Sequence, residues 1–284
     1  MTRGFAKRFS RGVCALALLA GLGLARSAAA QWVDYPTADV PRNADGTPNL
    51  KAPAPRTREG TPDLSGLWFS ADLLPECVGQ KDCIPQMNLP MDQINIGRTL
   101  EGGLPYTPVT AKLVAERTAN GAKDDPHAYC LPPNFPRAWS LPQYVKIAQS
   151  PKLTIVLHEF NASYRQIFTD GRKQLVDPSP SWNGYSVGHW EGDTLVVDSI
   201  GFNDRSFLDA RGTPHSSDMR VEERFRRIDY GHLEVTVTIT DPKTFTKPIK
   251  FTEVLEMLPD TDLFEHYCLE NEKDGRAAKA NAAK

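Results

Sequence analysis

The feature that most constrains this chain is a series of short β-forming segments that begins at Tyr144 and recurs about every ten residues. Gly, Pro, Asn or Asp separates successive segments, which is typical of antiparallel strands joined by short turns. Glu191-Gly192-Asp193 and Asp229-Tyr230-Gly231 mark two such turns. The segments expected to form strands are 144–149, 153–160, 164–169, 186–190, 194–201, 219–228, 232–240, 249–258 and 263–268.

This series predicts an all-β fold, either an antiparallel up-and-down barrel of the lipocalin-like kind or a strongly curved sheet. A two-sheet sandwich is the alternative. Strands and helices do not alternate, as they would in a parallel sheet. Apolar and polar residues alternate most cleanly over residues 233–240. One face of that strand is therefore expected to meet the core and the other to meet water.

The first thirty residues have the pattern of a secretory signal peptide. A basic start precedes an apolar run from Val13 to Ala25, and small residues follow up to Ala30, where cleavage is expected. A membrane anchor is the alternative, but the run is too short to span a bilayer. No later apolar run is long enough either. We therefore expect a periplasmic or secreted protein without a membrane span.

The rest of the chain divides by composition. Residues 31–60 are rich in Pro, Thr, Asn and Arg and predict an extended lead-in. Residues 61–272 are expected to form one barrel-like domain with an irregular, proline-rich insertion at 69–143, followed by a flexible tail at 273–284. Within the insertion, Pro108 and the threonines around it predict one helix over about Thr110–Thr118.

Charge argues against a nucleic-acid partner. The predicted signal peptide contains five of the 33 Lys and Arg residues and no acidic residue. The mature chain would then have 28 basic and 35 acidic residues, a net charge of −7. Nucleic-acid binders need a basic surplus or a basic patch, so a small molecule is the expected partner.

Four cysteines remain after the predicted cleavage, and export suggests that they form two disulfides. Three connectivities are possible. Cys77 and Cys83 bracket a short loop, so their local pairing closes the smallest loop. This pairing leaves Cys130 to join Cys268. A metal site is the alternative, but the spacing has neither C-x-x-C nor a matching histidine, and no metal is expected.

Several carboxylates share a strand face with apolar residues. Side chains two residues apart point to the same side of a strand, so Glu223 is expected inside with Met219, Val221 and Phe225. The same rule places Glu159 with Leu153, Ile155 and Leu157; Asp198 with Val196 and Ile200; and Glu253 with Phe251 and Leu255. A buried carboxylate must be paired, hydrogen-bonded or protonated. Pairing with arginine is the simplest explanation for each, whereas several carboxylates in one barrel could form a site.

His215 is the expected proton-transfer partner, because it lies in a polar loop just before the strand that contains Glu223. The motifs of α/β-hydrolases, P-loop proteins and dinucleotide-binding proteins are absent from the sequence, so no organic cofactor is expected. Aromatic residues gather around the 186–201 hairpin. They are Tyr164, Trp182, Tyr185, Trp190 and Phe202. These side chains could line a pocket for an apolar or aromatic ligand, or they could belong to the core.

Five motifs in order resemble a large, mostly uncharacterised family of secreted bacterial proteins. They are Y-R-Q-I-F-T-D-G-R at 164–172, G-H-W-E-G-D-T-L-V-V-D at 188–198, G-F-N-D at 201–204, P-H-S at 214–216 and E-R-F-R-R at 223–227. The resemblance covers about residues 125–272 and implies an exported, barrel-like protein. It implies no reaction. It supports the pairing of Cys130 with Cys268. Gly66-Leu67-Trp68 also resembles the G-x-W opening of lipocalin-like barrels.

Together these features predict an exported enzyme that acts on an apolar or aromatic small molecule without an organic cofactor. His215 would be the general acid or base, with Glu223, Glu159 or Asp198 as its carboxylate partner. Arg165 or Arg224 would hold an anion, and Trp182, Tyr185 and Asn203 would contact substrate. These residues suit a lyase or isomerase best, and a hydrolase second. The alternatives are a lipocalin-like binding protein for a hydrophobic ligand and an envelope-associated structural protein.

Overall fold

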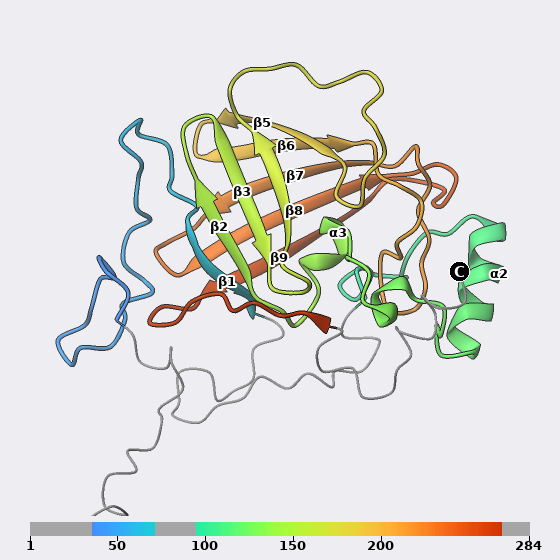
Figure 1. Ribbon diagram of the computed structural model, residues 1–284, viewed down its shortest axis with the longest axis horizontal. Coiled ribbons are helices and arrows are strands. Elements are labelled where there is room, and N and C mark those ends of the chain that lie inside the picture. The colour runs from blue at the N-terminus through green and yellow to red at the C-terminus, as the bar shows by residue number, and fades with distance from the viewer. Residues whose placement is uncertain (1–35, 72–94, 269–284) are drawn as a thin grey trace, which may run out of the picture. The chain divides into compact units, whose positions relative to one another are not determined.

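The computed structural model describes residues 36–71 and 95–268 and contains a closed nine-stranded β-barrel (Figure 1). The predicted signal peptide, Cys77, Cys83 and the predicted tail lie outside the described residues. The strands follow one another around the barrel in sequence order. They are β1 (Gly66–Ser70), β2 (Val145–Gln149), β3 (Leu153–His158), β4 (Ser163–Phe168), β5 (Tyr185–Glu191), β6 (Thr194–Ile200), β7 (Arg220–Arg227), β8 (His232–Thr240) and β9 (Ile249–Met257).

Every neighbouring pair is antiparallel except one. β4 and β5 run parallel, with Ile167 opposite Ser186, and the long connection at 169–184 returns the chain to the starting side of β4. A parallel pair needs such a crossover, whereas antiparallel strands need only a tight turn. The barrel closes where β1 pairs with β9, with Trp68 opposite Met257. The all-β barrel prediction is confirmed, and the sandwich is not found.

The ninth strand is not the one expected. Residues 263–268 form only an isolated bridge between Phe160 and His266, and β1 supplies the ninth strand instead. In β1 the side chains of Leu67, Trp68 and Phe69 are all buried. Because this strand has no polar face, the alternation that marks the other strands could not reveal it.

The helices with described bounds all precede β2. The predicted helix is confirmed as α2 (Pro108–Ala119), whose N-cap Thr107 accepts a hydrogen bond from the amide of Thr110. A 3₁₀ turn η2 (Pro126–Tyr129) and the short α3 (Phe135–Ala138) follow. None of the helices described here has the length and apolar character needed to cross a membrane.

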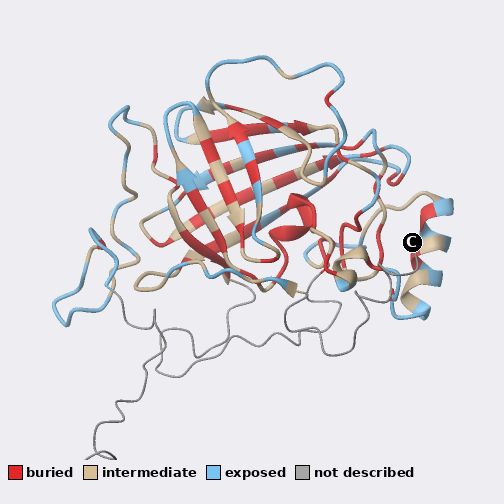
Figure 2. Ribbon diagram, in the orientation of Figure 1, coloured by how far each residue is buried: buried red, intermediate tan, exposed pale blue. Residues whose placement is uncertain are grey.

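A segment around α3 packs into one end of the barrel, and we call residues 133–141 the plug. All nine of its residues are buried, and α3 is accordingly red in Figure 2. Phe135 and Trp139 pack edge-on at 5.3 Å, and the ring of Trp139 meets that of Phe225 on β7 at 5.7 Å. The plug therefore completes the hydrophobic core with aromatic side chains.

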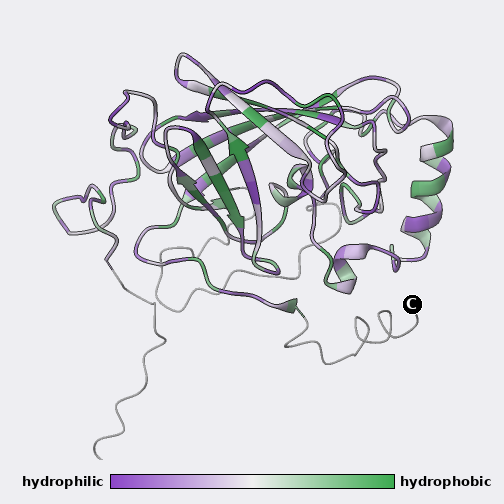
Figure 3. Ribbon diagram, turned by 45° about the horizontal axis from the view of Figure 1, so that its top comes forward, coloured by the Kyte–Doolittle hydropathy of each residue, from purple (hydrophilic) through white to green (hydrophobic). Residues whose placement is uncertain are grey.

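The N-terminal segment at 36–65 covers the other end. Arg56 donates two hydrogen bonds to Asp193 in the β5–β6 turn, at 3.0 and 2.7 Å. Gln149 at the end of β2 accepts from the amide of Leu64 and donates to the carbonyl of Pro62. Figure 3 shows this segment as mostly hydrophilic, in contrast to the hydrophobic residues along the strands. The predicted extended lead-in is thus tied to the barrel from Pro36 onward.

Candidate functional site

A buried ion pair occupies the barrel interior. Glu223 faces inward from β7, as predicted, and accepts two hydrogen bonds from the guanidinium of Arg165 on β4. The bond from Arg165 Nη1 to Glu223 Oε1 measures 2.9 Å, and the indole N–H of Trp139 donates to the same oxygen at 2.7 Å. Arg165 also donates to the hydroxyls of Ser186 and Ser199. These bonds offset the cost of burying both charges.

A second carboxylate of the barrel interior is paired in the same way. Glu253 faces inward from β9, as predicted, and accepts two hydrogen bonds from Arg98, the first at 2.8 Å. The hydroxyl of Ser140 donates to the same carboxylate at 3.2 Å. Both inward carboxylates on β7 and β9 therefore pair with an arginine and accept a hydrogen bond from the plug.

His215 lies in the β6–β7 loop at the plugged end and has a different partner from the one expected. Its Nε2 lies 2.8 Å from the Ser206 hydroxyl, and its Nδ1 lies 3.2 Å from the carbonyl oxygen of Ser216. A carbonyl oxygen can only accept, so Nδ1 donates its proton and Nε2 accepts from Ser206. Asn134 of the plug donates to the same Ser206 oxygen at 2.8 Å.

The expected convergence of His215 with the inward carboxylates is not found. Glu223 is held by Arg165 and Trp139, whereas His215 bonds Ser206 and Ser216. Burial lowers the pKa of His215, against the smaller opposing effects of the Ser216 carbonyl and of Asp241. A lowered pKa keeps the imidazole neutral at neutral pH, which is the form that can accept a proton.

The plug connects these buried groups. Its polar residues each bond a different partner: Asn134 bonds Ser206, Arg137 bonds Asp125, Trp139 bonds Glu223 and Ser140 bonds Glu253. The Arg137–Asp125 pair is also buried, with bonds of 2.8 and 2.6 Å. Asn134 thus holds the Ser206 hydroxyl from the plug side, while two other polar residues fix the plug to the barrel interior.

A further buried carboxylate lies between Ser206 and His215 in the sequence. Asp209 accepts from the amide and the hydroxyl of Thr213, and the Tyr106 hydroxyl lies 2.7 Å from that of Thr213. Burial raises the pKa of Asp209. Burial, together with the charge of Asp209, raises the pKa of Tyr106 to about 12. Both groups hold the loop that presents Ser206 and His215.

Two of the carboxylates that were predicted to face inward, Glu159 and Asp198, do not do so. On β3 the buried side chains are Thr154, Val156 and His158, so Glu159 lies on the opposite parity. Glu159 is half-buried just beyond the strand, where it accepts from the amide of Tyr144 at 3.2 Å, and burial raises its pKa. Asp198 is exposed on β6, because Val197 and Ser199 on either side of it face inward. Neither carboxylate bonds His215.

The predicted substrate-binding residues are dispersed. Arg165 is buried in the ion pair with Glu223, and Arg224 pairs with Glu191 on the outer surface at 2.6 Å. Tyr185 packs on Phe168 at 5.3 Å and accepts a hydrogen bond from Arg172. The Asn203 side chain accepts from the amide of Arg205, and Trp182 is half-buried near the start of β5. The structure brings none of them to His215.

Ser206, Asn134 and Trp139 have no sequence signal that marks them as members of a site. Ser206 lies in an ordinary polar loop. The sequence allows many Ser–His combinations, so it does not single out this pair. Asn134 had one local signal, because Asn before Phe-Pro is a favoured helix N-cap, and its Oδ1 does accept from the amide of Arg137. Nothing in the pattern indicated that this cap would also reach Ser206.

Within the part of the chain described, no group of three or more His, Cys, Asp or Glu residues could hold a metal ion. Cys130 and Cys268 form the expected disulfide. Comparisons with known protein families, with curated proteins and with solved structures find no match to this chain. The function therefore has to be argued from the site itself.

Proposed function

We propose that this protein is an exported enzyme that hydrolyses an ester-like bond in an apolar or aromatic small molecule. The proposal rests on one observation. The Ser206 hydroxyl lies 2.8 Å from Nε2 of His215, while Nδ1 of the same ring bonds the Ser216 carbonyl. A serine whose proton points at a neutral, oriented imidazole is the arrangement of an activated nucleophile.

The chemistry follows from these contacts. Ser206 Oγ would attack the carbonyl carbon of the substrate, and its proton would pass to Nε2 of His215. The imidazolium would then return that proton to the departing alcohol oxygen, which leaves an acyl group on Ser206. Water, deprotonated by the same histidine, would release the acid. The side-chain amide of Asn134, whose Nδ2 donates to Ser206 Oγ at 2.8 Å, would turn from that oxygen to the developing oxyanion as Ser206 attacks.

The surroundings of the pair support this assignment. The ring of Phe202 meets that of His215 edge-on at 6.3 Å. The apolar surroundings and the lowered pKa of His215 both favour the neutral base. Ser206 is only 3% exposed and His215 only 5%, so substrate entry requires the β6–β7 loop to move.

The contacts of the carboxylates favour hydrolysis over the lyase or isomerase chemistry that the sequence suggested first. A second acid or base close to His215 would be needed for proton abstraction and return, and Glu223 is held by Arg165 instead. A lipocalin-like carrier is less well supported, because Phe135 and Trp139 pack into the barrel where such proteins hold a ligand.

Labelling with a fluorophosphonate, which reacts with activated serines, tests the proposal. We expect a single phosphonylated residue, Ser206, identified by peptide mass spectrometry. Ser206→Ala should abolish labelling, and His215→Ala should slow it by about 10²-fold or more. Labelling should also weaken on acidification only below pH 6.5, because protonation of His215 removes the base. Labelling that persists in folded Ser206→Ala would contradict the proposal.

Ser217→Ala is the matched control. Ser217 is exposed, lies in the same loop and has no bond to His215 among the described residues. We expect this variant to label at the wild-type rate. A loss equal to that of Ser206→Ala would mean that the loop as a whole, and not the hydroxyl of Ser206, supports the reaction.

A further inference from the structure

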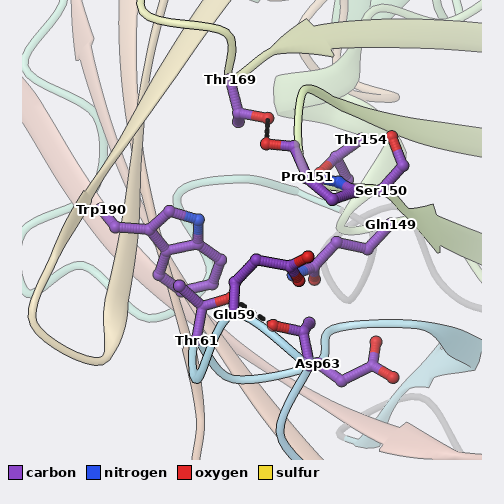
Figure 4. A pocket seen from close by; sticks show the side chains of 10 residues that line it. Glu59, Thr61, Asp63, Gln149, Ser150, Pro151, Thr154, Thr169 and Trp190 are labelled. Atoms are coloured by element: carbon purple, nitrogen blue, oxygen red, sulfur yellow. Dashed lines mark hydrogen bonds between the residues drawn. The ribbon is translucent and has the colours of Figure 1, made fainter.

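A separate pocket of about 270 Å³ lies at the opposite end of the barrel from His215. The N-terminal segment forms one wall, and the β2–β3 turn with the ends of β4 and β5 forms the other (Figure 4). Its ten lining residues include two carboxylates and no Lys, Arg or His. They are Thr57, Glu59, Thr61, Asp63, Gln149, Ser150, Pro151, Thr154, Thr169 and Trp190.

An aromatic face and a carboxylate meet in this pocket. Figure 4 shows the indole of Trp190 on one side and the side chain of Glu59 beside it, with the Glu59 carboxylate directed toward Gln149. Within the described part of the chain, Glu59 forms neither an ion pair nor a hydrogen bond. Asp63 uses Oδ1 to accept from the amide of Ser65. Its second oxygen has no hydrogen bond to a described residue.

The hydrogen-bond donors around the pocket are largely engaged. The hydroxyls of Ser150 and Thr169 donate to backbone carbonyls, and the amide of Gln149 donates to the carbonyl of Pro62. The hydroxyls of Thr57 and Thr61 pair with each other at 2.9 Å. The pocket therefore offers mainly acceptors and negative charge to a ligand.

Thr154 provides a separate indication that the pocket binds a ligand. Thr154 is 2% exposed and lines the pocket from β3. Its hydroxyl has no hydrogen bond to any described residue. The hydroxyl oxygen is not among the fully buried side-chain atoms, so it stays accessible from the pocket, and a ligand that fills the pocket would supply its partner.

We propose that this pocket binds a small organic cation with an ammonium head. The face of a tryptophan attracts such a cation, and Glu59 and Asp63 supply the opposite charge. A hydroxyl or N–H of the ligand would bond Thr154. A sugar, which also stacks on tryptophan, needs more free donors than this wall retains. The site is distinct from Ser206 and His215, and its test does not depend on the proposed hydrolysis.

Calorimetric titration of the full chain with choline tests the proposal. We expect binding, because choline combines a quaternary ammonium with one hydroxyl. 3,3-Dimethyl-1-butanol, which has the same shape without the charge, should bind at least about tenfold more weakly. Glucose should not bind. Equal binding of choline and its neutral analogue, binding of glucose in place of choline, or no binding of choline would each overturn the proposal.

Variants locate the site. Glu59→Gln removes an exposed carboxylate that has no hydrogen bond or ion pair with a described residue, and it should weaken choline binding about tenfold. Trp190→Leu should weaken it at least as much, although Trp190 also packs against the core. Glu222→Gln, an exposed carboxylate on the outer face of β7, is the control and should bind as the wild type does. Unchanged affinity in folded Glu59→Gln would overturn the assignment to this pocket.

Discussion

At the scale of the residue, the rule that side chains two apart share a face identified the two carboxylates that matter most to the barrel interior. It worked for Glu223 and Glu253 because β7 and β9 have large apolar residues on one face and charged ones on the other. What the rule could not supply was the partner. Arg165 lies 58 residues before Glu223, and it contacts that carboxylate only because the sheet closes.

The Arg165–Glu223 pair leads to a stability prediction. Glu223→Gln should destabilise the protein by about 3–5 kcal/mol, because it leaves the guanidinium of Arg165 buried without a counter-charge. Replacing both residues together, as Arg165→Met with Glu223→Leu, should restore much of that loss. Urea unfolding at pH 7 measures both effects.

Glu222→Gln, one residue away on the exposed face, is the control for this experiment and should change the free energy of unfolding by less than about 0.5 kcal/mol. A double variant no more stable than Glu223→Gln would contradict the interpretation. The loss would then come from packing and not from an unpaired charge.

At the scale of the element, β3 shows why apolar pattern alone can select the wrong face. Its aliphatic residues Leu153, Ile155 and Leu157 are half-buried on the outer side, whereas Thr154 and His158 are buried on the inner side. The interior at this point is an aromatic and polar environment created by the plug, whose Phe135 meets His158 edge-on at 6.2 Å. A rule that assigns the more apolar face to the core therefore fails.

The burial of His158 leads to a pH dependence of stability. Burial lowers its pKa from 6.5 to about 4, and neither ring nitrogen has a hydrogen-bond partner among the described residues. Below pH 6.5 the unfolded chain binds a proton that the folded chain does not, so stability falls as pH decreases toward 4. Between pH 7 and pH 5, we expect His158 to account for a loss of roughly 2 kcal/mol.

His158→Leu should therefore flatten this part of the stability profile, which urea unfolding at pH 7 and pH 5 would measure. The exposed His189 gives the control, since His189→Leu should retain the wild-type slope. If His158→Leu loses as much stability on acidification as the wild type, another group governs this range.

At the scale of the whole molecule, one disulfide joins the segment between β1 and β2 to the chain beyond β9. Cys130 precedes the plug and Cys268 follows β9, 138 residues later. Asn161, in the β3–β4 turn, accepts from the amide of Cys268 at 3.0 Å and donates to the carbonyl of Cys130. The disulfide thus holds the entry to the plug against the barrel, and it agrees with the export that the N-terminal pattern predicts.

Removal of this disulfide should be costly. A loop of this length corresponds to a stabilisation of about 5 kcal/mol in the chain-entropy treatment. Cys130→Ser with Cys268→Ser should lower the free energy of unfolding by up to about that amount, measured by urea unfolding without reductant. The double variant leaves Cys77 and Cys83 untouched, unlike a reducing agent. A loss below about 1 kcal/mol would show that the plug stays in place without the link.

The sequence by itself determined an all-β fold of successive strands, because the strands from β2 to β9 have local apolar patterns bounded by turn signals. The inward direction of Glu223 and Glu253 was determined for the same reason. Only the tertiary structure decided that β1 closes the barrel, that the plug fills one end and that Ser206 is the partner of His215. Those contacts join residues far apart in the chain, and no local pattern specifies which distant segment will fill a barrel end.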